Sequence, residues 1–301
     1  MLYRAVGYDG VFGVGVAVLA IDFLLRLLVI ERKVAMQYGI VDDEENERVC
    51  ESLDDTDETP LLERQVEIEE QEFRIAPISS RIVSTVPILA CMKNSSLLTA
   101  FFLAAVQALF LGAFDATVPT TAERYFGFDS LKSGLLFLPL SAMDLLVGPF
   151  AGRLVDRKGS KVVAVVGYSV LVPGHILLRL VQPQADGTDQ VALYFCLLAC
   201  IGIGMGIINA PAVTEASSVV EKYFKFNPTV FGGKSPYAQL YSINSMLFSL
   251  GLTVGPVLAG CLTKAINYGN MNAILAGVSA LAAVLSYRYL RGGVPKRNHC
   301  K

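Results

Sequence analysis

Seven long apolar segments constrain the fold of this chain more than any other feature of its sequence. Each is about 20 residues long, the length of α-helix that crosses the hydrocarbon core of a bilayer. Segments of this length must be helical, because lipid offers the backbone no hydrogen-bond partners. With 53% hydrophobic and 17% charged residues, the chain is predicted to be an all-α integral membrane protein with seven transmembrane helices. The predicted spans are Val11–Ile30, Leu97–Val118, Ser133–Ala151, Val162–Val181, Val191–Val213, Leu240–Leu262 and Asn272–Leu290.

The connections between these spans alternate in their content of Lys and Arg. Twelve lie in Gly152–Lys161, Thr214–Pro236 and the tail from Tyr287, against three in the intervening connections. Lys and Arg accumulate in cytosolic loops. The amino terminus is therefore predicted outside the cell or in a lumen, and the carboxyl terminus in the cytosol. Both a plasma membrane and a vacuolar or vesicular membrane fit this multi-pass topology.

Acidic residues are concentrated in one segment of the chain. Fifteen of the 27 Asp and Glu residues lie between Asp42 and Glu72, and a dense run of like charge with few aromatic residues is typical of a disordered segment. The predicted organisation is a first transmembrane helix (1–33), an acidic and mostly disordered cytosolic linker (34–92), a six-helix unit (93–291) and a cytosolic tail (292–301).

The connection "GRLVDRKGSK" (Gly152–Lys161) is the densest basic cluster next to a span. It resembles the motif G-x-L-x-D-R-x-G-x-K/R of the major facilitator superfamily, although Ser160 stands where a basic residue is commoner. Three further stretches resemble fungal drug:proton antiporter-like members and the related vesicular amine transporters. They are "AIDFLLRLLVIERK" (their helix 6), "GLLFLPLSAMDLLVGPFAG" (helix 8) and "GLTVGPVLAG" (helix 11). The motif matches at Gly152, Leu154, Asp156, Arg157, Gly159 and Lys161.

This resemblance implies that the seven spans correspond to helices 6–12, which are one helix plus the C-terminal six-helix half of such a transporter. The implied function is secondary active transport of a small organic solute or drug, coupled to protons, as in a multidrug antiporter. Because complete family members surround a midplane site with two halves, it also implies a missing N-terminal half or a second chain as partner, with truncation preferred. One alternative is a truncated, non-transporting membrane protein. A seven-helix receptor is the other, and the acidic linker and the transporter-type connection disfavour it.

Residue types within the motif indicate separate roles. Gly152 and Gly159 permit the backbone dihedrals of a tight reversal. Asp156 is expected to accept N–H groups at a helix N-terminus, and with Arg157 it is predicted to form a conformational latch. Lys161 is predicted to be a basic anchor on the cytosolic side, where it can also contact lipid headgroups.

Polar residues inside the spans are costly in lipid and are therefore functional candidates. Asp144 lies halfway along its span and could carry a coupling proton, with a helix-packing hydrogen bond as the alternative. An imidazole such as that of His175 titrates near neutral pH, although a structural role fits it equally. The candidate solute or proton path comprises Gln107, Asp144, His175, Asn209 and Asn244.

Other intramembrane residues are expected to serve the helices themselves. Asp22 and Arg26 are four residues apart and are predicted to pair on one helix face. Small residues four apart allow helices to approach closely, and proline removes a backbone hydrogen bond and kinks its helix. The predicted packing and hinge residues are Gly202, Gly206, Gly251, Gly255 and Pro256.

The sequence also argues against several classes of protein. It shows no nucleophile–base arrangement, phosphate-binding loop or cluster of metal ligands, so we expect no enzyme, no cofactor and no metal site. Its net charge is the balance between an acidic linker and basic connections, so it does not indicate a nucleic-acid partner. The expected partners are the lipid bilayer, a small-molecule solute and protons.

Overall fold

The computed structural model describes residues 2–28, 71, 73–75, 87–181, 188–231 and 236–292. The chain divides into two compact units, Met1–Glu69 and Glu70–Lys301. In the first, helix α1 (Leu2–Leu28) contains the apolar stretch Phe12–Leu25. The predicted pair between Asp22 and Arg26 stays a prediction, because the Arg26 side chain lies outside the described part of the chain. Most of the predicted acidic linker also lies outside it.

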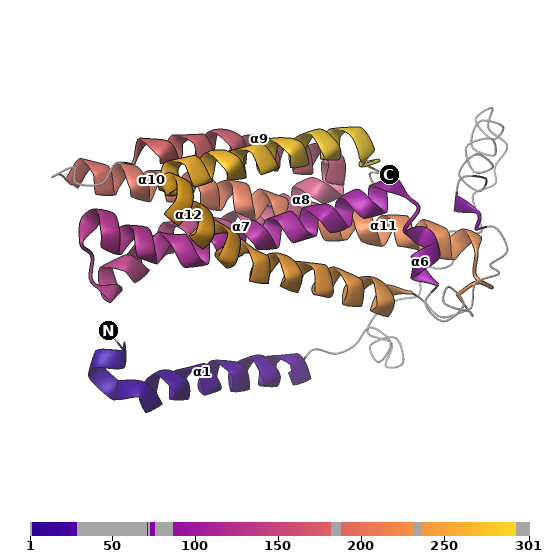
Figure 1. Cartoon of the computed structure of the whole chain (residues 1–301). Coiled ribbons are helices and arrows are strands. Elements are labelled where there is room, and N and C mark those ends of the chain that lie inside the picture. The colour runs from indigo at the N-terminus through magenta and orange to yellow at the C-terminus, as the bar shows by residue number, and fades with distance from the viewer. Residues whose placement is uncertain are drawn as a thin grey trace, which may run out of the picture. The chain divides into compact units, whose positions relative to one another are not determined.

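The second unit is a bundle of helices that run along one common long axis (Figure 1). The described residues contain helices and turns but no strand, which confirms the predicted all-α class. The helices of this unit are α6 (Ile88–Cys91), α7 (Ser95–Phe126), α8 (Ser130–Lys158), α9 (Ser160–Leu177), η1 (Leu178–Leu180), α10 (Thr188–Ile208), α11 (Pro211–Phe226) and α12 (Tyr237–Tyr289).

Two of the long helical stretches are interrupted. Asn267 has φ 70° and ψ 160° inside α12, so that two of the predicted spans are joined there through a sharp break. Asn is among the few residues that tolerate positive φ. Asn209 and Ala210 form a turn between α10 and α11, and the segment predicted to be a connection from Thr214 is instead helical as far as Phe226. In the described residues, five stretches are long and apolar enough to cross a membrane.

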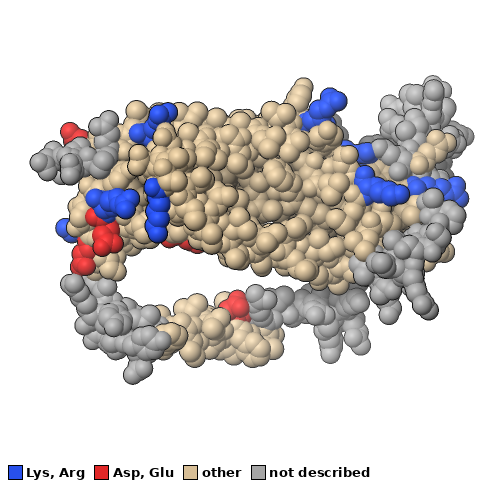
Figure 2. Space-filling view, viewed as in Figure 1, with Lys and Arg blue, Asp and Glu red and all other residues tan. Residues whose placement is uncertain are grey.

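The lateral surface of this unit is apolar. Leu145 is 76% exposed and Met246 is 73% exposed, which in water would be a large unfavourable apolar area. Figure 2 shows that Lys and Arg gather toward the two ends of the bundle, with a largely uncharged surface between them. An apolar band between two charged ends is the surface that a bilayer requires. The chain is an integral, multi-pass membrane protein.

Glycines set how closely the helices approach. A Cβ on Gly251 of α12 would lie 2.3 Å from the backbone oxygen of Ala105 in α7, and one on Gly255 would lie 2.4 Å from that of Leu109. Such distances leave no room for any side chain. The G-x-x-x-G pair therefore gives α12 its close approach to α7.

The second glycine pair lies on α10 and faces α8. A Cβ on Gly202 would lie 2.3 Å from the Leu140 oxygen, and one on Gly206 would lie 2.9 Å from the Asp144 oxygen. Pro256 packs against α7 as well, since its ring meets the position that a Cβ on Gly112 would occupy. The structure thus places all five predicted packing and hinge residues at helix contacts.

Candidate functional site

The turn between α8 and α9 consists of one residue, Gly159, with φ 85° and ψ 156°. That conformation is open to glycine and strained for other residues. Gly159 also lies against Gly292, which follows α12: a Cβ built on Gly159 would be 2.6 Å from the Gly292 carbonyl oxygen. The motif-bearing turn is therefore fixed to the C-terminal end of the last helix. By contrast, Gly152 lies inside α8, and a Cβ on it would meet nothing within 4 Å. The predicted role of Gly152 in the reversal is therefore wrong.

A buried carboxylate, Glu215 of α11, lies next to this turn and is 3% exposed. Its Oε2 accepts a hydrogen bond from the Ser160 hydroxyl in the first turn of α9. Its Oε1 accepts from the Ser96 hydroxyl of α7 at 2.5 Å and from the Arg291 backbone N–H at 3.0 Å. We call Ser96, Ser160, Glu215 and Arg291 the carboxylate hub. It joins α7, α9 and α11 to the end of α12.

The remaining motif residues have less specific surroundings. The Lys161 Nζ lies 5.2 Å from the centre of the Tyr287 ring on α12. Asp156 and Arg157 are exposed in the last turn of α8. The predicted capping role of Asp156 is wrong, since the N-cap of α9 is Gly159 and no side chain caps it. The latch role of Asp156 and Arg157 stays a prediction.

The described residues at the end of the predicted linker are packed rather than solvated. Phe73 is fully buried against Tyr223, with ring centres 5.0 Å apart. The Asn227 side chain makes two hydrogen bonds to the backbone of this segment. Its Nδ2 donates to the Phe73 carbonyl at 2.8 Å, and its Oδ1 accepts from the Ile75 N–H at 2.9 Å. The Arg291 guanidinium lies 5.1 Å from the Phe73 ring centre, so this segment contacts the carboxylate hub.

Two of the candidate path residues meet. The Gln107 Nε2 donates to the Asn209 Oδ1 at 3.0 Å, which links α7 to the turn between α10 and α11. Asn209 is exposed and Gln107 is half-buried. Asn244 is half-buried on α12.

Asp144 and His175 have contrasting surroundings. Asp144 is half-buried on α8, and its side chain has no hydrogen-bond partner within the described part of the chain. His175 is fully buried, 5.0 Å from the Phe110 ring centre. Its Nδ1 lies 2.7 Å from the Leu171 carbonyl oxygen, which can only accept, so Nδ1 carries the proton. These contacts favour the structural role for His175.

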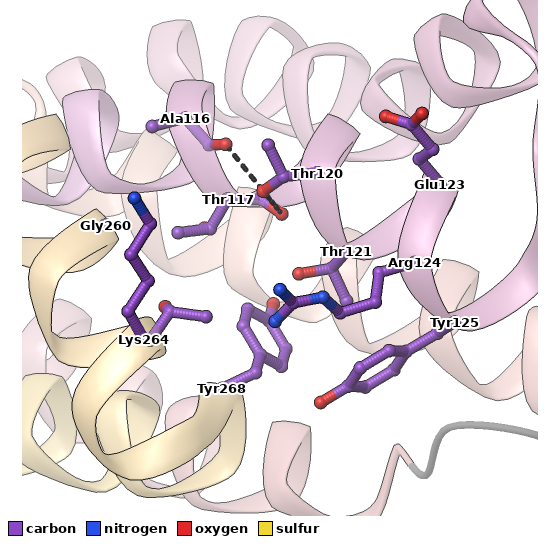
Figure 3. A pocket seen from close by; sticks show the side chains of 11 residues that line it. Ala116, Thr117, Thr120, Thr121, Glu123, Arg124, Tyr125, Gly260, Lys264 and Tyr268 are labelled. Atoms are coloured by element: carbon purple, nitrogen blue, oxygen red, sulfur yellow. Dashed lines mark hydrogen bonds between the residues drawn. The ribbon is translucent and has the colours of Figure 1, made fainter.

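A cavity of about 550 Å³ (Figure 3) lies at the opposite end of the bundle from the α8–α9 turn (Figure 1). It opens between the C-terminal part of α7 and the middle of α12. None of its lining residues was among the predicted site residues. In the sequence, the one signal for these lining residues is the presence of Arg124 and Lys264 in two connections that contain few charged residues. The lining comprises Ala116, Thr117, Thr120, Thr121, Glu123, Arg124, Tyr125, Gly260, Thr263, Lys264 and Tyr268.

Comparison with known proteins decides the family. The model of the Major Facilitator Superfamily matches residues 1–225. The chain belongs to this superfamily. Its members are transporters rather than enzymes, and the membership agrees with the resemblance carried by Gly152–Lys161.

Several curated superfamily proteins are similar to this chain. It is 38% identical to the MFS-type transporter ppzB of Metarhizium majus, over 96% of this chain and 66% of that protein. It is 31% identical to the uncharacterized MFS-type transporter C18.02 of Schizosaccharomyces pombe, over 89% and 56%. It is 22% identical to the chromaffin granule amine transporter of Homo sapiens, over 73% and 38%. The chain thus spans less than two thirds of the length of these relatives.

Proposed function

We propose that this superfamily chain contributes to secondary active transport of a small organic solute, coupled to protons. The observation that carries the proposal is the superfamily match, since it covers α1 and the helices through most of α11. The similarity to a protein named as an amine transporter supports a small organic solute. In this proposal the seven spans act as helices 6–12, and either a missing N-terminal half or a second chain completes the solute path.

The proposed orientation places the α8–α9 turn and the carboxylate hub in the cytosol and the cavity of Figure 3 on the outer side. It rests on the excess of Lys and Arg in the connections on the side of that turn. The carboxylate hub then closes the cytosolic ends of α7, α9, α11 and α12 into one rigid group. Rocking of such a group against a second half is the usual way in which transporters alternate access.

Asp144 is the proposed carrier of the coupling proton. It lies on a membrane helix, is half-buried, and has no hydrogen-bond partner in the part of the chain that the structure describes. A carboxyl group inside a membrane span is costly, so its presence there marks it as a functional candidate. Gln107 and Asn209, joined at 3.0 Å, are proposed to line the same path.

Proteoliposomes that contain a pH-sensitive dye test this proposal. Addition of aromatic anions and aromatic cations in turn should produce proton movement with at least one of them. Asp144→Asn should retain solute exchange and lose proton movement, whereas Asp115→Asn, at an exposed position on α7, should keep both. No proton or solute flux with any compound, both for this chain and for a form extended by an N-terminal half, would overturn the proposal.

A further inference from the structure

The outer cavity carries two cations without carboxylate partners. Arg124 of α7 and Lys264 of α12 both line it, and in the described part of the chain neither forms an ion pair. The single acidic side chain of the lining, Glu123, points away from Arg124 in Figure 3. A cavity with two cations and one acid on its walls has a positive potential, which favours a negatively charged occupant.

The hydroxyl groups of the same walls offer few free donors. The Thr117 and Thr120 hydroxyls donate to backbone carbonyls of their own helix, at 2.7 and 2.9 Å, so their protons are already used. The Thr263 Oγ1 has no hydrogen-bond partner among the described residues, but it is enclosed by protein rather than exposed to the cavity. The two cations, and not the hydroxyl groups, therefore carry the preference for an anion.

Aromatic rings form the remaining wall. Tyr125 and Tyr268 pack edge to face with ring centres 6.2 Å apart, and the Tyr268 hydroxyl is held 3.2 Å from that of Tyr194. Tyr268 is only 1% exposed and packs behind this wall. The half-buried Tyr125 ring can receive a third ring, since aromatic pairs prefer offset or edge-to-face packing. The volume of about 550 Å³ is within the range of sites for drug-sized ligands.

We propose that this cavity is a binding site for an organic anion, with the negative group between Arg124 and Lys264 and an aromatic ring against Tyr125. The inference rests on the proposed transport function only in that the site would then be the outer entry for the solute. The binding itself does not require transport.

Equilibrium dialysis of the chain in nanodiscs, with radiolabelled p-aminohippurate as the aromatic carboxylate, tests the inference. Arg124→Gln and Lys264→Gln should each weaken binding at least about tenfold, since each removes a charged hydrogen-bond donor to the anionic group. Lys264→Arg keeps the positive charge and should retain binding. It therefore distinguishes binding that is lost with the charge from binding that is lost because the protein does not fold. The matched control is Lys132→Gln, at the same end of the bundle but over the Phe128 ring at 5.6 Å and outside the lining.

Charge specificity decides the outcome. Benzyltrimethylammonium, which has a ring and the opposite charge, should not displace p-aminohippurate. Absence of saturable binding, displacement by the cation, or unchanged affinity in both glutamine variants would overturn the inference. The proton-flux assay remains separate. Proton-coupled flux without saturable p-aminohippurate binding would reject the anion site and keep the transporter, whereas specific binding without any flux would do the reverse.

Discussion

Gly159, between α8 and α9, lies so close to Gly292, beyond the end of α12, that a Cβ on Gly159 would be 2.6 Å from the Gly292 carbonyl oxygen. Both residues have positive φ, 85° and 63°. The turn between α8 and α9, which carries the basic superfamily motif, is therefore held against the C-terminal end of α12. The Ser160 hydroxyl strengthens that tie through Glu215. The serine that departs from the superfamily motif thus has a specific partner in this chain.

Replacement of Gly159 by alanine should lower stability by at least about 2 kcal/mol. Positive φ with ψ 156° is essentially confined to glycine and costs another residue about 1–3 kcal/mol, and the new methyl group would also meet the Gly292 backbone. For a chain of this size we expect the apparent unfolding temperature in detergent to fall by about 4–8 °C. Gly152→Ala is the matched control, because its Cβ would meet nothing within 4 Å. Equal melting temperatures for the two variants would contradict the tie.

The carboxylate hub predicts a strong dependence on Glu215. Glu215→Gln should cost about 1.5–3 kcal/mol, since it weakens hydrogen bonds made to a charged group. Ser160→Ala should cost less in the Glu215→Gln background than in the unsubstituted chain, because the two residues share one interaction. Glu221→Gln, exposed on the same helix, should change stability by less than about 0.5 kcal/mol. Additive effects of Ser160→Ala and Glu215→Gln in thermal unfolding would rule the hub out.

The contact between α12 and α7 should not tolerate a side chain at Gly251. Gly251→Ala places a methyl group 2.3 Å from the Ala105 backbone oxygen, and overpacking of this kind costs about 1–3 kcal/mol. Gly277→Ala on the same helix has open space around its Cβ and should be neutral. Thermal unfolding and yield of monodisperse protein compare the two variants. A Gly251→Ala protein as stable as Gly277→Ala would mean that α12 and α7 are farther apart than described.

Cys91, in α6 outside the membrane spans, should resist thiol reagents while the protein is folded. Burial raises the pKa of its thiol from the ordinary 9.0 to about 12. At pH 8 the reactive thiolate should therefore be on the order of 1,000-fold rarer than in the unfolded chain. The folded state holds this proton more tightly, so its stabilising effect is complete below about pH 9 and is lost as the pH rises toward 12.

Maleimide labelling of a variant in which Cys91 is the only cysteine measures this protection. Labelling at pH 8 should be slow in the native protein and rapid after denaturation. The same rate in both states would show that α6 is not packed against the bundle.

The sequence predicted the bundle well and the carboxylate hub not at all. Apolar length alone locates membrane helices, because lipid leaves the backbone no alternative. The predicted spans from Leu97 onward are mostly helical, although Val191–Val213 crosses the turn between α10 and α11. Small residues four apart likewise marked the close contacts at Gly202 and Gly251. These features depend on local sequence, which a single chain carries in full.

The role of Glu215 could not be predicted from the sequence, because it depends on distant parts of the chain. The sequence places it in a cytosolic connection, where a charged residue is usually solvated. Its burial arises only where Ser96 of α7, Ser160 of α9 and Arg291, which follows α12, meet it. The cavity between α7 and α12 was missed for the same reason, since Arg124 and Lys264 become neighbours of one cavity only when α7 packs on α12.

Proton-coupled flux in proteoliposomes tests the central claim most directly. Vesicles containing the chain, with an inward or outward pH gradient, should exchange at least one labelled aromatic solute at a rate that depends on the gradient. A protonophore should abolish the dependence of the rate on the pH gradient. The Asp144→Asn variant should exchange the solute at a rate that does not depend on the gradient. Flux equal to that of protein-free vesicles for every solute, in both gradient directions, for this chain and for a form extended by an N-terminal half, would contradict the assignment of this chain to transport.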